Sequence, residues 1–221
     1  MKRKMIIGLV LGAGLMLAGC SDKASDIEYA DADAAKEALN SASTVTLMEK
    51  DLDDATGAGD ILADEKVAGY WYAGGFLDPT WTVSVDGKDW FYVKFVTDEP
   101  INDVEGVDSS TTYGYYDMND NCLGYCQEQY IPVEDDVSEC YVMFLDADGN
   151  VREDYYASEG CYELYDYDDN VIASVEGNVN WFGGGGKVTF TMEDGVDQEV
   201  DIKDKVAMMI PHMTELESLG D

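Results

Sequence analysis

The feature that most constrains the fold is an alternation of apolar and polar residues on both sides of Asp86-Gly87. Residues 81–85 read Trp, Thr, Val, Ser and Val, and residues 91–95 return with apolar side chains at every second place. Successive side chains of a strand point to opposite faces, so each segment has one apolar face. An Asp-Gly pair between two such segments is the strongest short-range signal of a β-hairpin. Residues 80–96 are therefore predicted to form a hairpin.

Strand-like patterns continue beyond Val67, and a second Asp-Gly hairpin is predicted at residues 187–202, KVTFTMEDGVDQEVDI. Before them, residues 31–41 predict a short helix with an Asp at its start. Near the C-terminus, residues 206–210 form a short apolar piece that Pro211 interrupts. The predicted fold class is all-β: an antiparallel meander forming a barrel or a sandwich, with a short N-terminal helix.

A weak internal repeat has Asp and Asn four residues apart, at 117–121, 146–150 and 166–170. Each copy follows an aromatic-rich strand pattern. The copies start 29 and then 20 residues apart, so they indicate a meander of similar hairpins and not a solenoid of fixed period.

These copies also place oxygen-bearing side chains at alternate positions, as the first half of a calcium loop does. Asp146, Asp148 and Asn150 are the candidate ligands. A complete EF-hand loop closes with a glutamate at position twelve, where this copy has Ala157. Asp, Asn and Gly also dominate ordinary tight turns. We interpret the copies as hairpin turns, with a calcium site as the alternative, and expect no other cofactor.

The N-terminus carries an export signal. Residues 2–4 are basic, and residues 5–17 form an uncharged apolar run shorter than the about 20 residues that cross a bilayer. This arrangement is typical of a secretory signal peptide. Leu17-Ala18-Gly19-Cys20 resembles the lipobox of bacterial lipoproteins. The resemblance implies cleavage before Cys20 and acylation of its thiol, hence a lipid-anchored location at the cell membrane or outer membrane, facing outside the cytoplasm.

The chain is accordingly divided into four predicted parts. Residues 1–19 are the signal peptide, and residues 20–43 are a lipidated tether with the short helix. Residues 44–213 form a single β-rich domain, and residues 214–221 are a C-terminal tail.

The formal charge of −34 limits the partners of this protein. Residues 1–19 contain three basic residues and no acidic ones, so the mature chain is still more negative. Such a field repels phosphate backbones, which excludes nucleic acid as an expected partner. It also repels anionic lipid headgroups, so the acyl chains on Cys20 must supply the membrane contact.

Four cysteines follow Cys20, and an even count in an exported chain suggests two disulfides with three connectivities. If Cys140 and Cys161 each open a strand, with one strand between them, they lie about 9.6 Å apart. A disulfide needs Cα atoms within about 7 Å. This favours Cys126 with Cys140 and Cys122 with Cys161, and free thiols are the alternative.

No catalytic arrangement stands out. The one histidine, His212, lies beside Pro211 in an apolar context, which is more typical of packing than of a general base. Paired carboxylates can hydrolyse glycosides, but among 47 acidic residues a pair has no diagnostic value. The enzyme alternative is therefore a small carboxylate-dependent glycoside hydrolase, and we expect no enzyme.

Aromatic side chains are the better candidates for a binding surface. Trp90 and Tyr92 alternate with the apolar residues of the first hairpin. If the apolar face is the core, these two rings form an exposed ridge; the alternative is that a barrel or a sandwich buries both faces of this strand. Exposed rings beside carboxylates suit a sugar or a protein partner. The leading hypothesis is a non-enzymatic, envelope-anchored binding module for carbohydrate or protein, and a further alternative is a calcium-stabilised structural lipoprotein.

Overall fold

A computed structural model describes residues 26–49, 57–74, 79–102, 110–133, 137–179 and 186–219. Twelve strands within these ranges close into a barrel in which sequence neighbours pair antiparallel and β1 also pairs with β12. The predicted all-β antiparallel fold is confirmed, and closure selects the barrel over the sandwich. The elements are α1 (Ala32–Ser41), β1 (Thr44–Glu49), β2 (Ala58–Ala63), β3 (Lys66–Gly74), β4 (Thr80–Val85), β5 (Lys88–Thr97), β6 (Ser110–Asp117), β7 (Cys122–Val133), β8 (Val137–Leu145), β9 (Val151–Ser158), η1 (Glu159–Cys161), β10 (Glu163–Tyr165), β11 (Val171–Val179), β12 (Gly186–Met192) and α2 (Ile202–Leu219).

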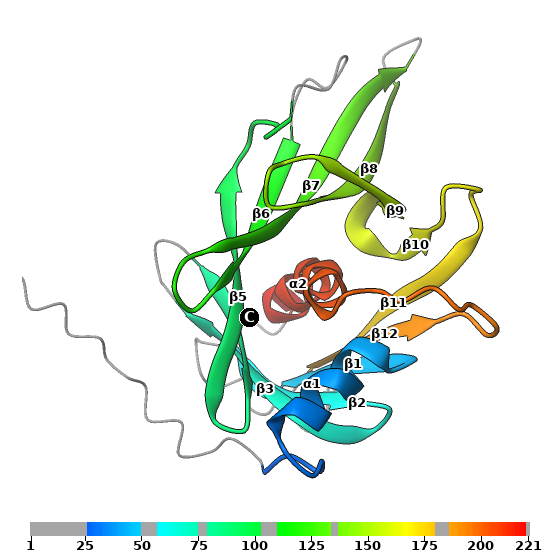
Figure 1. Cartoon of the computed structure of the whole chain (residues 1–221). Helices are drawn as coiled ribbons and strands as arrows, with labels where there is room; N and C mark the ends of the chain where they lie inside the picture. Colours follow the sequence, from blue (N-terminus) through cyan, green and yellow to red (C-terminus); the bar gives the residue numbers. More distant parts are fainter. Residues whose placement is uncertain are drawn as a thin grey trace, which may run out of the picture.

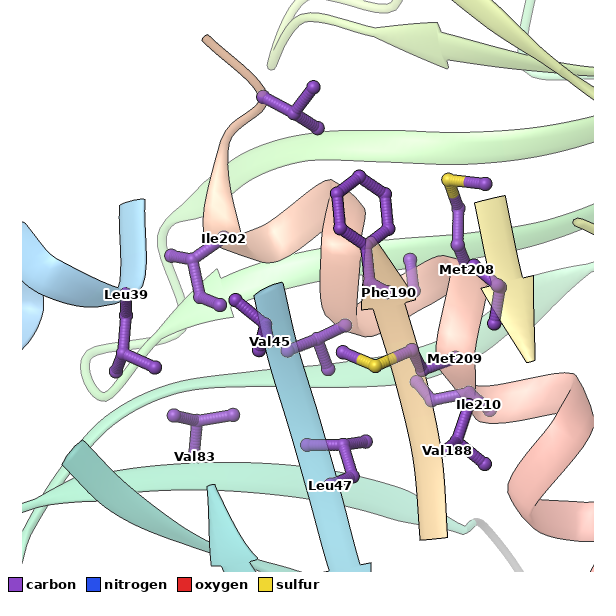
Figure 2. Close-up of a cluster of buried hydrophobic side chains, with 14 of the residues drawn as sticks. Leu39, Val45, Leu47, Val83, Val188, Phe190, Ile202, Met208, Met209 and Ile210 are labelled. Carbon is purple, nitrogen blue, oxygen red and sulfur yellow. The ribbon is translucent and has the colours of Figure 1, made fainter. Parts of the chain in front are cut away.

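The C-terminal helix α2 lies inside the ring of strands, where Figure 1 shows it end-on. Residues 204–210 are all buried, so α2 has no water-facing side along this stretch. Met208, Met209 and Ile210 pack beside Phe190 of β12 (Figure 2). Each such side chain contributes about 1.5–3 kcal/mol by leaving water. The helix therefore fills the interior and forms one hydrophobic core with the inner faces of the strands.

The structure corrects the predicted break at Pro211, because α2 continues through it to Leu219. A proline inside a helix removes one backbone hydrogen bond and costs about 3 kcal/mol. Burial of the whole turn before Pro211 offsets that cost. The segment predicted as a C-terminal tail thus belongs largely to α2.

The second predicted hairpin is wrong in its return strand. A turn does form after β12, where the Val196 amide donates to the Glu193 carbonyl at 3.3 Å and Gly195 has φ +84°. The residues that follow do not pair with β12, because β1 and β11 already occupy both of its edges. Ile202, predicted as a strand residue, instead opens α2.

The first hairpin is confirmed as β4 and β5, with Asp86 and Gly87 at φ +52° and +68° in the turn. A register shift follows Val83: it pairs with Phe91, whereas the next residue of β4 pairs with Asp89. Trp90 is thus an extra residue in β5 and leaves the simple alternation.

Helix α1 packs against the barrel through Ala35 and Leu39, which are fully buried. The Asp31 side chain caps its start by accepting a hydrogen bond from the Ala34 amide at 2.9 Å. This helix confirms the prediction for residues 31–41. Within the part of the chain that the structure describes, no helix is both long and apolar enough to cross a lipid bilayer.

Candidate functional site

The outer wall of the barrel carries a first tyrosine group, the Tyr92 cluster, formed by Tyr92, Tyr116 and Lys94. The register places Tyr92 of β5 opposite Tyr116 of β6, and the two rings stack with centroids 5.3 Å apart at 18°. Gly114 leaves room for this stack, because a Cβ there would lie 2.7 Å from the Tyr116 ring. The Tyr92 hydroxyl donates to Asp120 at 2.6 Å. Lys94 places its Nζ 4.5 Å from the centre of the Tyr116 ring.

A second group, the Tyr156 cluster, is formed by Tyr141, Tyr156, Tyr165 and Tyr167. Tyr156 of β9 lies opposite Tyr165 of β10, and their rings stack with centroids 5.4 Å apart at 15°. Tyr141 and Tyr167 meet Tyr156 edge-on, at 5.7 Å and 5.9 Å. The Tyr156 hydroxyl donates to Asp169 at 2.6 Å. Each cluster therefore contains one stacked pair of tyrosines and one aspartate that accepts a hydrogen bond from a tyrosine hydroxyl.

Both clusters are built by one repeated sequence, Tyr-Asp-x-x-Asp-Asn, at residues 116–121 and 165–170. Its tyrosine is the last or the next-to-last residue of a strand and stacks on a tyrosine of the preceding strand. Its fifth residue, Asp120 or Asp169, has φ +63° or +61° in the hairpin turn and accepts that neighbour's hydroxyl. In the middle copy Leu145 and Gly149 replace the tyrosine and this aspartate, so no such cluster is built there.

The carboxylates change the acidity of the tyrosines that they accept from. Partial burial, together with the bond to Asp120, raises the pKa of Tyr92 to about 12. The bond to Asp169, together with partial burial, raises the pKa of Tyr156 to about 12. Both hydroxyls thus stay protonated at neutral pH.

The hairpin interpretation of the repeat is confirmed by its hydrogen bonds. Asp146 Oδ1 accepts from the amides of Asp148 and Asn150, each at 2.9 Å, and Asn150 Nδ2 donates to Oδ2 at 3.0 Å. These bonds, led by that from the Asn150 side chain, lower the pKa of Asp146. A calcium ion at these three residues stays a prediction, and it would compete with those donors. Among the described residues no group of three His, Cys, Asp or Glu side chains is placed to hold a metal.

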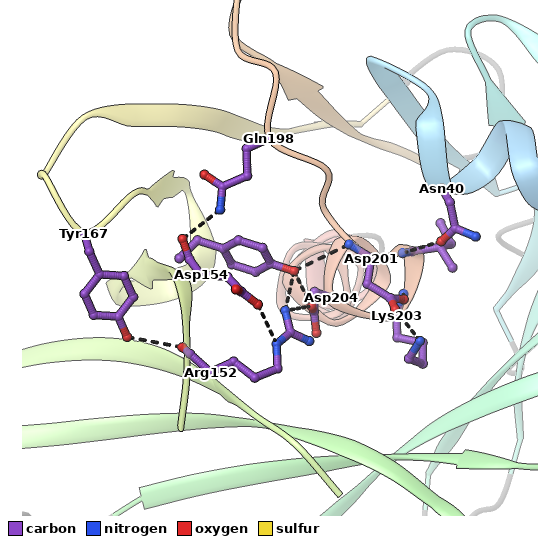
Figure 3. Close-up of polar contacts among 10 residues, drawn as sticks. Asn40, Arg152, Asp154, Tyr167, Gln198, Asp201, Lys203 and Asp204 are labelled. Atoms are coloured by element: carbon purple, nitrogen blue, oxygen red, sulfur yellow. Dashed lines mark hydrogen bonds and ion pairs between the residues drawn. The ribbon is translucent and has the colours of Figure 1, made fainter. Parts of the chain in front are cut away.

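A polar network lies on the inner side of the wall where α2 begins (Figure 3). Asp204 of α2 is fully buried, and its Oδ2 accepts from Tyr155 at 2.5 Å and from Arg152 Nη2 at 2.8 Å. Burial raises the pKa of Asp204, and Arg152 and Tyr155 act against this. Burial lowers the pKa of Arg152, but Asp204 and Tyr155 raise it by more, so the guanidinium stays charged. The network ties α2 to β9.

The start of α2 is also tied to α1. Asn40 accepts from the Ile202 amide at 3.1 Å, and Asp201 caps α2 by accepting from the Lys203 amide at 2.9 Å (Figure 3). The buried Lys205 of α2 also donates to three backbone carbonyls at the end of α1, with its Nζ 2.7 Å from the backbone carbonyl oxygen of Asn40. Burial lowers the pKa of Lys205 to about 8. These groups hold the two helices together.

A polar cleft of about 440 Å³ opens beside this network. Its lining residues are Asn40, Arg152, Asp154, Tyr155, Glu199, Val200 and Asp201. Arg152 already pairs with Asp154 and Asp204, and Asp204 does not reach the cleft. The inner network is therefore best explained as the structural attachment of α2.

The two residues predicted as a binding ridge are separated by the bulge in β5. Tyr92 lies on the outer wall and stacks as described above. Trp90 instead packs edge-on against Phe91 at 5.2 Å, with the Lys36 ammonium of α1 5.2 Å from its ring. The structure thus places Tyr92 on the outer wall and Trp90 against the core, and ligand binding at either residue stays a prediction. The tyrosines of β6, β8, β9 and β10 were missed, although the repeated Tyr-Asp-x-x-Asp-Asn was the signal that marks two of them.

The predicted disulfides are not formed, and the four described cysteines are free thiols. Cys126 lies opposite Phe144 and Cys140 opposite Tyr130, so the register keeps this pair four positions apart. Cys122 pairs across the sheet with Tyr116, whereas Cys161 is buried in the core.

Burial raises the pKa of Cys140 and of Cys161 to about 12, which keeps both thiols protonated and unreactive. His212 is buried too, and its Nε2 lies 3.3 Å from the Cys161 carbonyl oxygen. The predicted acylation site, Cys20, lies outside the described residues.

Comparisons of this chain with protein-family models, with curated proteins and with solved structures found no match.

Proposed function

We propose that this protein is a non-enzymatic binding module of the cell envelope that recognises a carbohydrate or a protein through the tyrosines on its outer wall. The observation that carries the proposal is the repeated Tyr-Asp-x-x-Asp-Asn sequence, which builds two tyrosine–carboxylate clusters on that wall. Helix α2 occupies the interior, so the outer wall is the surface that offers ordered aromatic side chains to a ligand.

The clusters combine the two properties that recognition surfaces use. Tyrosine supplies a rigid apolar ring with a polar tip, which is why it is enriched at interfaces. The bonds to Asp120 and Asp169 hold two of the rings in one orientation before a ligand arrives. A preorganised ring loses less conformational entropy on binding. These features support binding of a sugar face or of a partner protein.

The proposed location rests on the sequence alone. The lipobox ending at Cys20 supplies a lipid anchor, and residues 21–30 provide a polar spacer between that anchor and α1. The barrel would then stand at the membrane surface, outside the cytoplasm, with its outer wall accessible to envelope polymers and proteins.

The test uses the full chain, extracted from its membrane in detergent. We expect wild type to bind a defined envelope glycan, or to retain an identified envelope protein, and the double variant Tyr92→Leu and Tyr156→Leu to lose at least tenfold in affinity. The pair Tyr29→Leu and Tyr162→Leu is the matched control, since both residues lie outside the clusters. Equal binding by wild type and the cluster variant, or no binding by wild type, would refute the proposal. Mass spectrometry of the same preparation should show acyl mass at Cys20.

A further inference from the structure

In the Tyr92 cluster, the ammonium group of Lys94 lies against the stacked tyrosine pair. Lys94 lies two residues after Tyr92 on the same face of β5. Its ammonium is 4.5 Å from the centre of the Tyr116 ring and 5.8 Å from that of Tyr92. A cation within about 6 Å of a ring centre is attracted by the negative face of the ring. This pair is therefore filled by a cation from its own chain.

The Tyr156 cluster has the same stacked pair without that cation. The residue two places after Tyr156 is Ser158, so the position equivalent to Lys94 carries no charge. In the ranges that the structure describes, no lysine or arginine lies over the rings of Tyr156, Tyr165 or Tyr167. The cluster also has two more rings than the first one, and Tyr167 is 48% exposed.

Negative charge surrounds the Tyr156 cluster. Asp169 accepts from Tyr156, and Glu163 accepts from Tyr165. Glu153 and Asp154 lie close enough to act on Tyr167. With a formal charge of −34 on the chain, this surface attracts cations and gains nothing comparable from a neutral sugar.

We propose that the Tyr156 cluster binds the ammonium group of a lysine side chain on a partner protein, in the way that Lys94 occupies the Tyr92 cluster. The inference rests on the proposed function and specifies its partner as a basic protein. Lysine is the occupant because Lys94 shows a primary ammonium seated on a pair of the same geometry. The carboxylates beside the rings complement its charge.

The test follows the tyrosine ring signals of the full chain, labelled with carbon-13 on tyrosine, by NMR in detergent micelles. The probe is an end-blocked Gly-Ser-Gly-Lys-Gly-Ser-Gly peptide, and its Nε-acetyl-lysine counterpart is the matched ligand control. We expect the lysine peptide to shift the Tyr156 and Tyr165 signals in a saturable way, and the acetylated peptide to shift neither. The substitution Tyr156→Leu should weaken binding about threefold, since an exposed cation–π contact is worth about 0.5–1 kcal/mol.

The variant Tyr162→Leu is the matched protein control, because it makes the same change at a 52% exposed tyrosine outside both clusters and should leave the affinity for the peptide unchanged. Tyr165→Leu repeats the test from the partner ring, and the melting temperatures of the variants verify their folding. Equal affinities of wild type, Tyr156→Leu and Tyr165→Leu would overturn the inference, because general attraction to an acidic surface would then suffice. Tighter binding of tetramethylammonium than of the lysine peptide would also overturn it.

Failure of this inference is distinguishable from failure of the proposed function. If the double cluster variant loses its envelope ligand while the lysine peptide shows no binding that depends on Tyr156, the outer wall binds something other than lysine. If wild type retains no envelope ligand, the proposed function itself fails.

Discussion

Tyr155 and Tyr156 are consecutive residues of β9 on opposite sides of the barrel wall. Each donates its hydroxyl hydrogen bond to an aspartate, one in the interior and one at the surface. Inside, the Tyr155 hydroxyl donates to Asp204 at 2.5 Å, and the Arg152 guanidinium lies 5.1 Å from the ring centre. Outside, the Tyr156 hydroxyl donates to Asp169 at 2.6 Å, and no cation of the described chain lies over its ring. Ring, carboxylate and cation are all present inside, whereas the described residues supply only ring and carboxylate at Tyr156 outside.

This contrast identifies which of the two arrangements is structural. A buried carboxylate without a cation costs several kcal/mol, so Arg152 beside Asp204 stabilises the folded state. An exposed carboxylate is solvated by water and needs no partner, so Asp169 can stand beside the rings with no cation from its own chain. The incomplete arrangement on the surface is therefore the one available to a ligand.

Removing the cation inside the barrel should change the stability most. Arg152→Met leaves the fully buried Asp204 carboxylate without its countercharge, and we expect the free energy of unfolding to fall by about 3–5 kcal/mol. Urea denaturation measures the loss. Lys203→Met is the control, since Lys203 forms a more exposed ion pair with Asp201 and should cost at most about 1 kcal/mol. If Arg152→Met also lost no more than about 1 kcal/mol, the ion pair of Arg152 with Asp204 would have no structural role.

The pH dependence of the same variant separates charge from packing. The pKa of Asp204 is raised in the folded protein, mainly by burial. A carboxyl of this kind favours the folded state at low pH and costs stability as pH rises through its folded pKa. Without Arg152 that pKa rises further, so the difference between wild type and Arg152→Met should shrink as the pH falls from 7 to 4. A difference independent of pH would point to lost packing.

A middle-sized effect is expected from deleting one hydroxyl on each side of the wall. Tyr155→Phe removes a buried hydrogen bond to a charged group and should cost about 1.5–3 kcal/mol. Tyr156→Phe removes the equivalent bond at the surface and should cost less than about 0.5 kcal/mol. Thermal unfolding of the two variants, side by side, measures both losses. Equal losses would mean that the environment does not distinguish the two tyrosines.

The smallest effect tests whether Lys94, a residue of the same chain, blocks the Tyr92 cluster. Lys94→Met keeps the length of the side chain and removes its ammonium, so the Tyr92 and Tyr116 rings should now respond to the lysine peptide as the Tyr156 cluster does. We expect a gained site with an affinity within about threefold of the existing one. NMR titration of the tyrosine ring signals measures it. Lys187→Met, which removes an equal charge from the exposed side of β12, should gain no site.

The parts of the fold that follow from local sequence were predictable. Alternation around Asp86-Gly87 specified β4 and β5, because side-chain period and turn chemistry act over a few residues. The Asp–Asn repeat specified its three turns for the same reason. Alternation did not predict correctly which face of the sheet Trp90 lies on. The extra residue in β5 arises from its pairing with β4, and no local sequence signal marks it.

Longer-range features were not predictable from the pattern. Residues 194–202 have the local signal of a hairpin, and only the occupied edges of β12 show why no return strand forms. The cysteine spacing allowed two disulfides, and the register of β7 against β8 keeps Cys126 from Cys140. Competition for a strand edge and register are both properties of the assembled sheet.

The antiparallel strand content, the hairpin turns and the strong negative charge follow directly from the amino-acid sequence, because backbone preference and ionisation depend on neighbouring residues. The pairing of β1 with β12 and the helix at residues 202–219 within the barrel follow only from the assembled fold. The same holds for the two distant repeats that each place a tyrosine pair beside an aspartate. These outcomes depend on contacts between residues far apart in the chain, whose free energy exists only once the barrel has closed.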